Sequence, residues 1–167
     1  MTEPKIIILH AWDPGESTGY ARSRLMVECP NNSHIEVEGT STMVGSHVIA
    51  NFYRSWVNKK YTPDTKQLFL LERFRLFEHA KNSQVWSEFP AVSARGHIEL
   101  VAELLGCEVR YQNPADMTSF KQVAVLKQRL FLTSIPPSEH ERDALRHAAY
   151  FYYANQKGLL DIWKKLK

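Results

Sequence analysis

The chain has 167 residues, of which 44% are hydrophobic and 23% charged, and its formal net charge is +3. This length and composition predict one globular domain over residues 1–167 with a buried core. Because no apolar run approaches the roughly 18 residues of a membrane span, and the first residues do not have the pattern of a signal peptide, membrane and secreted proteins are excluded and we expect an intracellular protein.

Charge is distributed unevenly along the chain. Residues 1–50 carry three basic and six acidic side chains. Residues 51–116 carry nine basic and eight acidic side chains, and residues 117–167 carry nine basic and four acidic ones. The balance runs from −3 through +1 to +5, which favours a polyanion as the partner of the last third. Lysines on solvated helix faces produce the same balance, so charge alone does not decide. The two cysteines, Cys29 and Cys107, fit free thiols in a reducing compartment.

The first half of the chain predicts mainly strands. Residues 5–12 form a short apolar run, residues 20–28 predict a second strand, and residues 34–44 alternate as a half-buried strand does. Turn residues between these runs favour an antiparallel meander. Apolar residues then recur at helical spacing over residues 46–57, and a further apolar strand follows over residues 67–74.

The second half predicts mainly helices. Residues 96–106 have helical spacing and end in glycine, and residues 107–112 predict a fifth strand. Residues 119–131 then predict one helix, and residues 138–158 predict the last one. This order of elements predicts an α/β fold with a five-stranded mixed sheet, in which three antiparallel strands are followed by parallel ones.

Two of the predicted strands end in a carboxylate. Asp13 follows the run IIILHAW and precedes a Pro-Gly turn, and Glu72 ends the run QLFLLE. In the last predicted helix, His140, Asp143 and His147 recur at i, i+3 and i+7 and therefore share a face. If the first and fourth strands are neighbours, as apolar central strands usually are, these acids and His140 form one cluster.

Such a cluster predicts a metal site. Three close carboxylates repel one another unless a cation lies between them. Magnesium is the expected cation because it prefers oxygen ligands, with manganese as the alternative. Two such ions, about 3.5–4 Å apart, activate a water and stabilise the leaving oxygen of a phosphodiester.

Each of these residues also has a purely structural interpretation. Asp13 suits a turn aspartate, Glu72 an edge-strand charge paired with a following arginine, and Asp143 a first-turn complement to the helix dipole. A histidine such as His147 is more often an ordinary interface residue than a ligand. The joint occurrence of these residues in this order of elements is what favours the site.

Three motifs resemble those of one family. ILHAWDPGESTGYA resembles the first-strand motif of the RuvC-type Holliday-junction resolvases, LFLLERF is similar to their second motif, and HERDALRHA resembles their C-terminal motif. The resemblance covers most of the chain and implies a ribonuclease H-like fold, a homodimer, and metal-dependent endonucleolytic cleavage of Holliday junctions or other branched DNA. It implies metal-binding, catalytic roles for Asp13, Glu72, His140 and Asp143.

The same resemblance implies DNA contacts. In the family an aromatic residue soon after the second-motif glutamate meets the DNA at the crossover, which implies Phe74 first and Phe77 next. Basic residues before the last helix contact phosphates, which implies Lys121, Lys127 and Arg129.

The chain also departs from the family pattern. Trp12 stands where a small aliphatic residue is usual, and the glycine-rich, lysine-bearing loop of cellular members has no counterpart. These departures indicate a divergent, phage-type branch. We therefore expect the protein to be located in the cytoplasm of a bacterial cell or a phage-infected host cell.

Three other functions stay open. The first motif is also similar to the phosphate loop of actin-like and sugar-kinase ATPases, which need a second domain for which this chain has no room. A ribonuclease H acting on RNA–DNA hybrids uses the same acids. A non-catalytic junction-binding protein would keep the fold without the metal, although four suitable ligands argue against it.

Overall fold

Strand β1 (Lys5–Asp13) lies at the centre of the sheet in the computed structural model of this chain, which describes residues 4–29, 32–44, 52, 61–73 and 90–166. The sheet has the order β3-β2-β1-β4-β5. The other strands are β2 (Ser17–Cys29), β3 (Asn32–Val44), β4 (Thr65–Glu72) and β5 (Glu108–Gln112). β1, β2 and β3 pair antiparallel, whereas β4 is parallel to both β1 and β5. The predicted mixed sheet and the adjacency of the first and fourth strands are confirmed.

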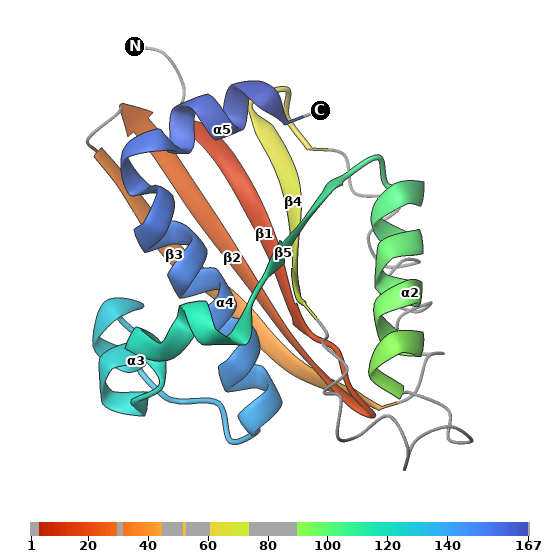
Figure 1. The fold of residues 1–167 in the computed structure, drawn as a ribbon. Coiled ribbons are helices and arrows are strands. Elements are labelled where there is room, and N and C mark those ends of the chain that lie inside the picture. Colours follow the sequence, from red (N-terminus) through yellow and green to blue (C-terminus); the bar gives the residue numbers. More distant parts are fainter. Residues whose placement is uncertain (1–3, 30–31, 45–51, 53–60, 74–89, 167) are drawn as a thin grey trace.

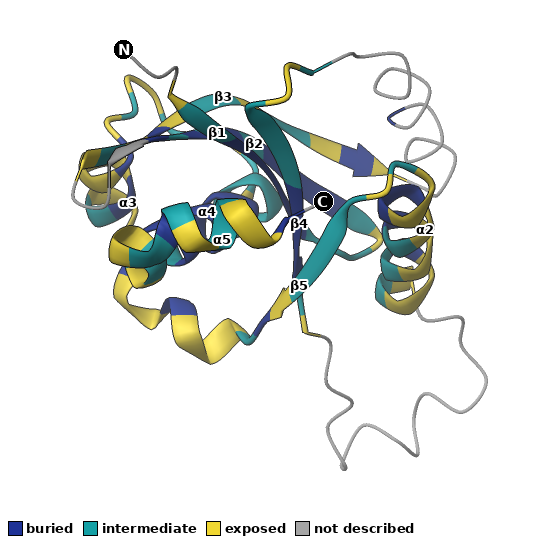
Figure 2. Ribbon diagram, turned by 90° about the horizontal axis from the view of Figure 1, so that it is seen from above, coloured by how far each residue is buried: buried dark blue, intermediate teal, exposed yellow. Residues whose placement is uncertain are grey.

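Helices cover both faces of the sheet (Figure 1). α4 (Glu139–Asn155) and α5 (Leu159–Lys165) pack on one face, joined by the short 3-10 helix η3 (Gln156–Gly158), and α2 (Pro90–Leu104) packs on the other. Figure 2 shows the central strands buried between these layers. Among the described helices, none combines the length and apolar character that crossing a membrane requires.

The alternation of side chains along β1 separates two cores. One set packs against α4 and consists of Ile7, Leu9 and Ala11. Trp12 points to the opposite face, where its ring centroid lies 4.4 Å from that of Tyr20 and 4.9 Å from that of Phe52. Since neighbouring residues of a strand face opposite sides, Asp13 lies on the α4 side. The bulky Trp12 is therefore accommodated without entering the space around Asp13.

The helix predicted over residues 119–131 is divided in the structure, so that prediction was wrong. The 3-10 helix η2 (Pro114–Phe120) comes first and the short α-helix α3 (Val123–Arg129) follows, with Gln122 extended between them at φ −72° and ψ 124°. Phe120 and Leu126 are both buried. Six residues apart, they would face different sides of one helix, so the break lets both pack.

Of two further predicted helices, one ends earlier than predicted and the other lies almost wholly outside the described residues. The last one ends at Asn155 rather than at residue 158, and the separate helix α5 follows it. The helix predicted over residues 46–57 lies outside the described residues except for Phe52, which is buried beside Trp12 and Tyr20.

Candidate active site

The carboxyl ends of β1 and β4 bring Asp13 and Glu72 to one edge of the sheet. These parallel strands pair Ala11 with Leu70 and Trp12 with Leu71. Asp13 and Glu72 come next in each strand. Both are separated by two residues from side chains that pack against α4, so both point to the α4 side.

The first half of α4 supplies the facing side chains. His140 Nδ1 lies 2.8 Å from Asp13 Oδ2. About two turns further along the helix, His147 Nε2 lies 3.2 Å from Glu72 Oε2, and its Nδ1 lies 2.8 Å from Gln112 Oε1. His147 is fully buried, whereas the His140 side chain is 45% exposed. The two histidines thus hold the two strand-end acids, one from the solvent side and one from beneath.

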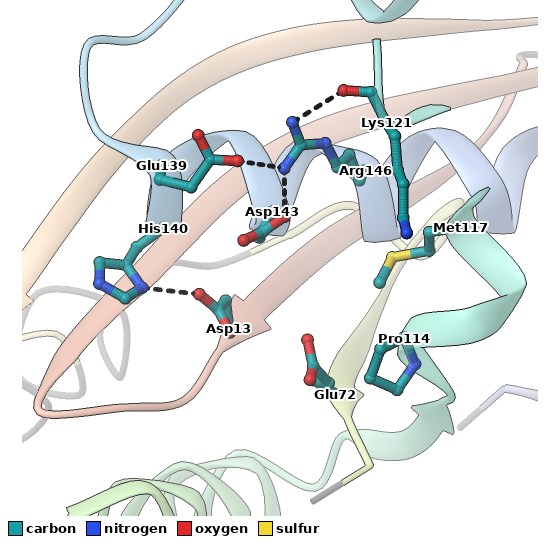
Figure 3. A pocket seen from close by; sticks show the side chains of 9 residues that line it. All are labelled: Asp13, Glu72, Pro114, Met117, Lys121, Glu139, His140, Asp143 and Arg146. Atoms are coloured by element: carbon teal, nitrogen blue, oxygen red, sulfur yellow. Dashed lines mark hydrogen bonds and ion pairs between the residues drawn. The ribbon is translucent and has the colours of Figure 1, made fainter. Parts of the chain in front are cut away.

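The four predicted ligands line one cavity of about 610 Å³. The lining residues come from β1, β4, η2, α4 and the segment after η2, and Figure 3 shows their side chains. They are Asp13, Glu72, Pro114, Met117, Lys121, Glu139, His140, Asp143 and Arg146. The four side chains that the sequence predicts to cluster therefore do lie around one cavity, and their metal-binding and catalytic roles stay predictions.

The electrostatics of Asp13 reflect how crowded this cavity is. Burial raises the pKa of Asp13 from 3.8 to about 6, and the nearby charges of Glu72 and Asp143 also raise it, while the hydrogen bond from His140 lowers it. A carboxylate held in a partly dry cavity beside two others is the environment that a divalent cation relieves.

Each acid is at present held by its own partner. Asp13 is paired with His140, Glu72 with His147, and Asp143 with Arg146. As the side chains lie, no three His, Cys, Asp or Glu groups of the described chain converge closely enough to enclose one ion. The donor set nevertheless fits a hard cation, since three carboxylates and an imidazole ring face one cavity. Rotation of the half-exposed His140 ring would free the carboxylate oxygen of Asp13, and release from Arg146 would free that of Asp143.

The residues predicted to contact DNA lie in different parts of the chain, and their role stays a prediction. Lys121 lines the cavity. Lys127 and Arg129 are exposed on α3, the helix that follows Lys121 in the chain. Phe74 and Phe77 lie outside the described residues.

Sequence reasoning missed two charged cavity residues and one supporting residue. Glu139 directly precedes His140, and Arg146 follows Asp143 by one helical turn, so their spacing on α4 gives the signal that could have found them. Gln112, at the end of β5, is opposite Glu72 in the register and could have been found from the parallel pairing.

Two solved structures with a similar backbone come from Thermus thermophilus. RuvC of that organism in complex with Holliday junction substrate superposes with a TM-score of 0.62 at 13% identity, over 89% of this chain and 95% of that chain. A second structure of T. thermophilus RuvC gives a TM-score of 0.62 at 15% identity, over 88% and 95% of the two chains. The fold is RuvC-like. Neither a protein-family model nor a curated protein sequence matches this chain.

This RuvC-like fold confirms the predicted fold class, a ribonuclease H-like α/β domain with a mixed sheet. At 13–15% identity the likeness concerns the backbone. The chemistry of the site therefore depends on the side chains of this chain.

His147→Ala is expected to lower the free energy of unfolding by about 2–3 kcal/mol, because it leaves Gln112 and Glu72 unpaired and opens a cavity beneath the site. His140→Ala, at a half-exposed position on the same helix, should cost about 1 kcal/mol or less. Urea denaturation in EDTA measures both. Equal losses for the two variants would contradict the supporting role of His147.

Proposed function

We propose that this chain is a divalent-metal-dependent, structure-selective endonuclease that cleaves phosphodiester bonds in Holliday junctions or other branched DNA. The observation that carries the proposal is the cavity itself. Three acids and a histidine from β1, β4 and α4 line it, at a site in a RuvC-like fold where the pKa of Asp13 is raised to about 6. A perturbed acid that shares a cavity with other acids is typical of a reaction centre rather than of a structural face.

Asp13, Glu72 and Asp143 would hold magnesium, or manganese in its place, through carboxylate oxygens, and His140 through its ring. Two ions per site would supply activation of a water and neutralisation of the charge that develops on the phosphodiester. The residues of the chain do the remaining work. His147 and Gln112 fix the orientation of Glu72 from the buried side. Lys121, which lines the cavity, would offer its ammonium group to a DNA phosphate.

A homodimer is part of the proposal, because two symmetric cuts in a four-way junction require two sites. α2 supports it with three exposed apolar side chains. They are Val92, Leu100 and Leu104, which are 48%, 53% and 57% exposed. Spacings of eight and then four residues place them on one face of the helix. A second copy of this chain packed along that stripe would bury it.

The test is cleavage of a labelled synthetic four-way junction in magnesium, beside a linear duplex and an RNA–DNA hybrid. We expect paired nicks near the crossover for the wild type and none for Asp13→Asn. Cutting of the hybrid alone would make the chain a ribonuclease H. Tight junction binding without cutting, in magnesium and in manganese, would make it a binding protein.

Junction binding is expected to weaken steeply with salt, because each phosphate contact contributes about −0.9 to the slope of log K against log salt on duplex DNA. Lys121→Ala, Lys127→Ala and Arg129→Ala should each reduce the slope by about one. Lys157→Ala, at an exposed position beyond the far end of α4, is the matched control and should leave it unchanged. Fluorescence anisotropy in EDTA gives the slopes, and a flat dependence for the wild type would reject this face as the DNA contact.

A further inference from the structure

The guanidinium of Arg146 is fixed inside the cavity beside Asp143 (Figure 3). Its Nη1 is paired with Asp143 Oδ1 and lies 2.6 Å from Glu139 Oε1. Its Nε donates to the carbonyl of Phe120 at 3.3 Å, and its Nη2 donates to the carbonyl of Lys121 at 3.1 Å. The side chain is 9% exposed. A planar fork held at four points has one orientation, so its charge stays where it is.

That charge is permanent. Burial alone would lower the pKa of the Arg146 guanidinium, but its hydrogen bonds to Glu139 and Asp143 raise it. The same contact lowers the pKa of Glu139 to about 2, with help from Arg142. Arg146 therefore places one positive charge on the Asp143 side of the cavity at every physiological pH.

The opposite side of the cavity is different. Asp13 and Glu72 are held by the imidazoles of His140 and His147. A ring nitrogen of histidine that carries no proton can itself bind a metal, whereas the guanidinium of arginine has no acceptor and keeps its proton. The three carboxylates of the cavity are consequently not equivalent toward a cation.

We propose that Arg146 is a positioning residue that makes the two halves of the cavity unequal, so that a first divalent cation binds with Asp13 and Glu72 and a second, which needs Asp143, binds much more weakly in the absence of DNA. This inference rests on the proposed function and deepens it. Repulsion between a fixed guanidinium and a divalent ion on the same carboxylate lowers the affinity about tenfold or more. A substrate phosphodiester brings the negative charge that offsets this repulsion, so the complete site forms on the DNA.

The test is calorimetric titration of Mn²⁺ into the metal-free protein without DNA. For the wild type we expect one tight ion and a second at least about tenfold weaker. Arg146→Met should tighten the second ion until the two differ by about threefold or less, whereas Arg146→Lys, which keeps the charge, should preserve the gap. Arg142→Met is the matched control on the same helix, because Arg142 pairs with Glu139 and the carbonyls of Pro136 and Pro137 but is not among the residues that line the cavity.

A second variant tests the inference without removing a buried arginine. Asp143→Asn in the wild-type background should abolish the weak ion and leave the tight one within about threefold of its wild-type affinity. Thermal unfolding gives an independent readout. In EDTA the melting temperature of Arg146→Met should be lower than that of the wild type, and added Mn²⁺ should raise it by more.

Several outcomes would overturn the inference. They are two ions of equal affinity in the wild type, a gap that survives Arg146→Met, or loss of the tight ion in Asp143→Asn. If neither the wild type nor Arg146→Met binds Mn²⁺, both this inference and the metal-dependent function fail. If the Mn²⁺ affinities of the variants change as expected but four-way junctions are not cut, the role of Arg146 is upheld and the proposed nuclease function is rejected.

Discussion

Asp13→Asn is expected to abolish junction cleavage and at the same time to stabilise the metal-free protein by about 2–3 kcal/mol at neutral pH. Burial raises the pKa of Asp13 from 3.8 to about 6, with further contributions from the charges of Glu72 and Asp143. The folded state thus holds the proton more tightly than the unfolded state. The stabilisation that this proton provides is complete below about pH 4 and is lost as the pH rises through about 6. Above that pH the ionised carboxylate opposes folding, and asparagine removes this cost.

Thermal unfolding in EDTA measures the effect. Near pH 7.5 the variant should melt roughly 5 °C or more above the wild type, and the difference should shrink as the pH falls from about 6 to about 4. Added Mn²⁺ should raise the melting temperature of the wild type more than that of the variant. Asp161→Asn, which removes an exposed aspartate of α5, is the control and should change stability by about 0.5 kcal/mol at most. A variant no more stable than the wild type near pH 7.5 would show that these carboxylates are not crowded.

The central part of this fold could be predicted because its strands carry strong local signals. The apolar runs that became β1 and β4 are short, rich in branched residues and bounded by turns, and each ends in an acid. The period of two along a strand then places Asp13 and Glu72 on one face. Helical spacing places His140, Asp143 and His147 on one side of α4. The predicted cluster follows from these two periods and the adjacency of the strands.

What could not be predicted depends on tertiary contacts. The break at Gln122 exists because Phe120 and Leu126 must both be buried, and the local sequence favours an unbroken helix. The spacing of Arg146 from Asp143 is visible in the sequence, but an arginine in that position usually extends into water. It turns into the cavity because the carbonyls of Phe120 and Lys121 accept two of its N–H groups.

The function of Gly19 depends on a residue far along the chain. Gly19 lies directly opposite Asp13 in the antiparallel pairing of β1 with β2. A Cβ at this position would lie 1.9 Å from the carbonyl oxygen of His140 and 2.2 Å from its carbonyl carbon. Glycine thus allows the start of α4 to rest on the backbone of β2, within hydrogen-bonding distance of Asp13. The strand sequence around Gly19 does not reveal this role, because the contact is with a residue of α4 more than 100 positions away.

Gly19→Ala is therefore expected to reduce junction cleavage by at least about 100-fold, because the methyl group must push the first turn of α4 away from the strand ends. A displacement of about 1 Å is enough for such a loss in a preorganised site. The free energy of unfolding should fall by about 1–3 kcal/mol, as for other overpacked positions. Affinity for Mn²⁺ should fall as well, because His140 and Asp143 both move with the helix.

The neighbouring strand offers a matched control for this substitution. A methyl group on Gly39 of β3 would meet no described atom within 4 Å, so Gly39→Ala should leave cleavage within about twofold of the wild type and stability within about 0.5 kcal/mol. Cleavage rates measured well below the melting temperature separate displacement of the helix from unfolding. If Gly19→Ala cleaves junctions within about threefold of the wild type, the close approach of α4 to β2 does not position the site. If both variants lose activity equally, the loss reflects the strands and not the contact with His140.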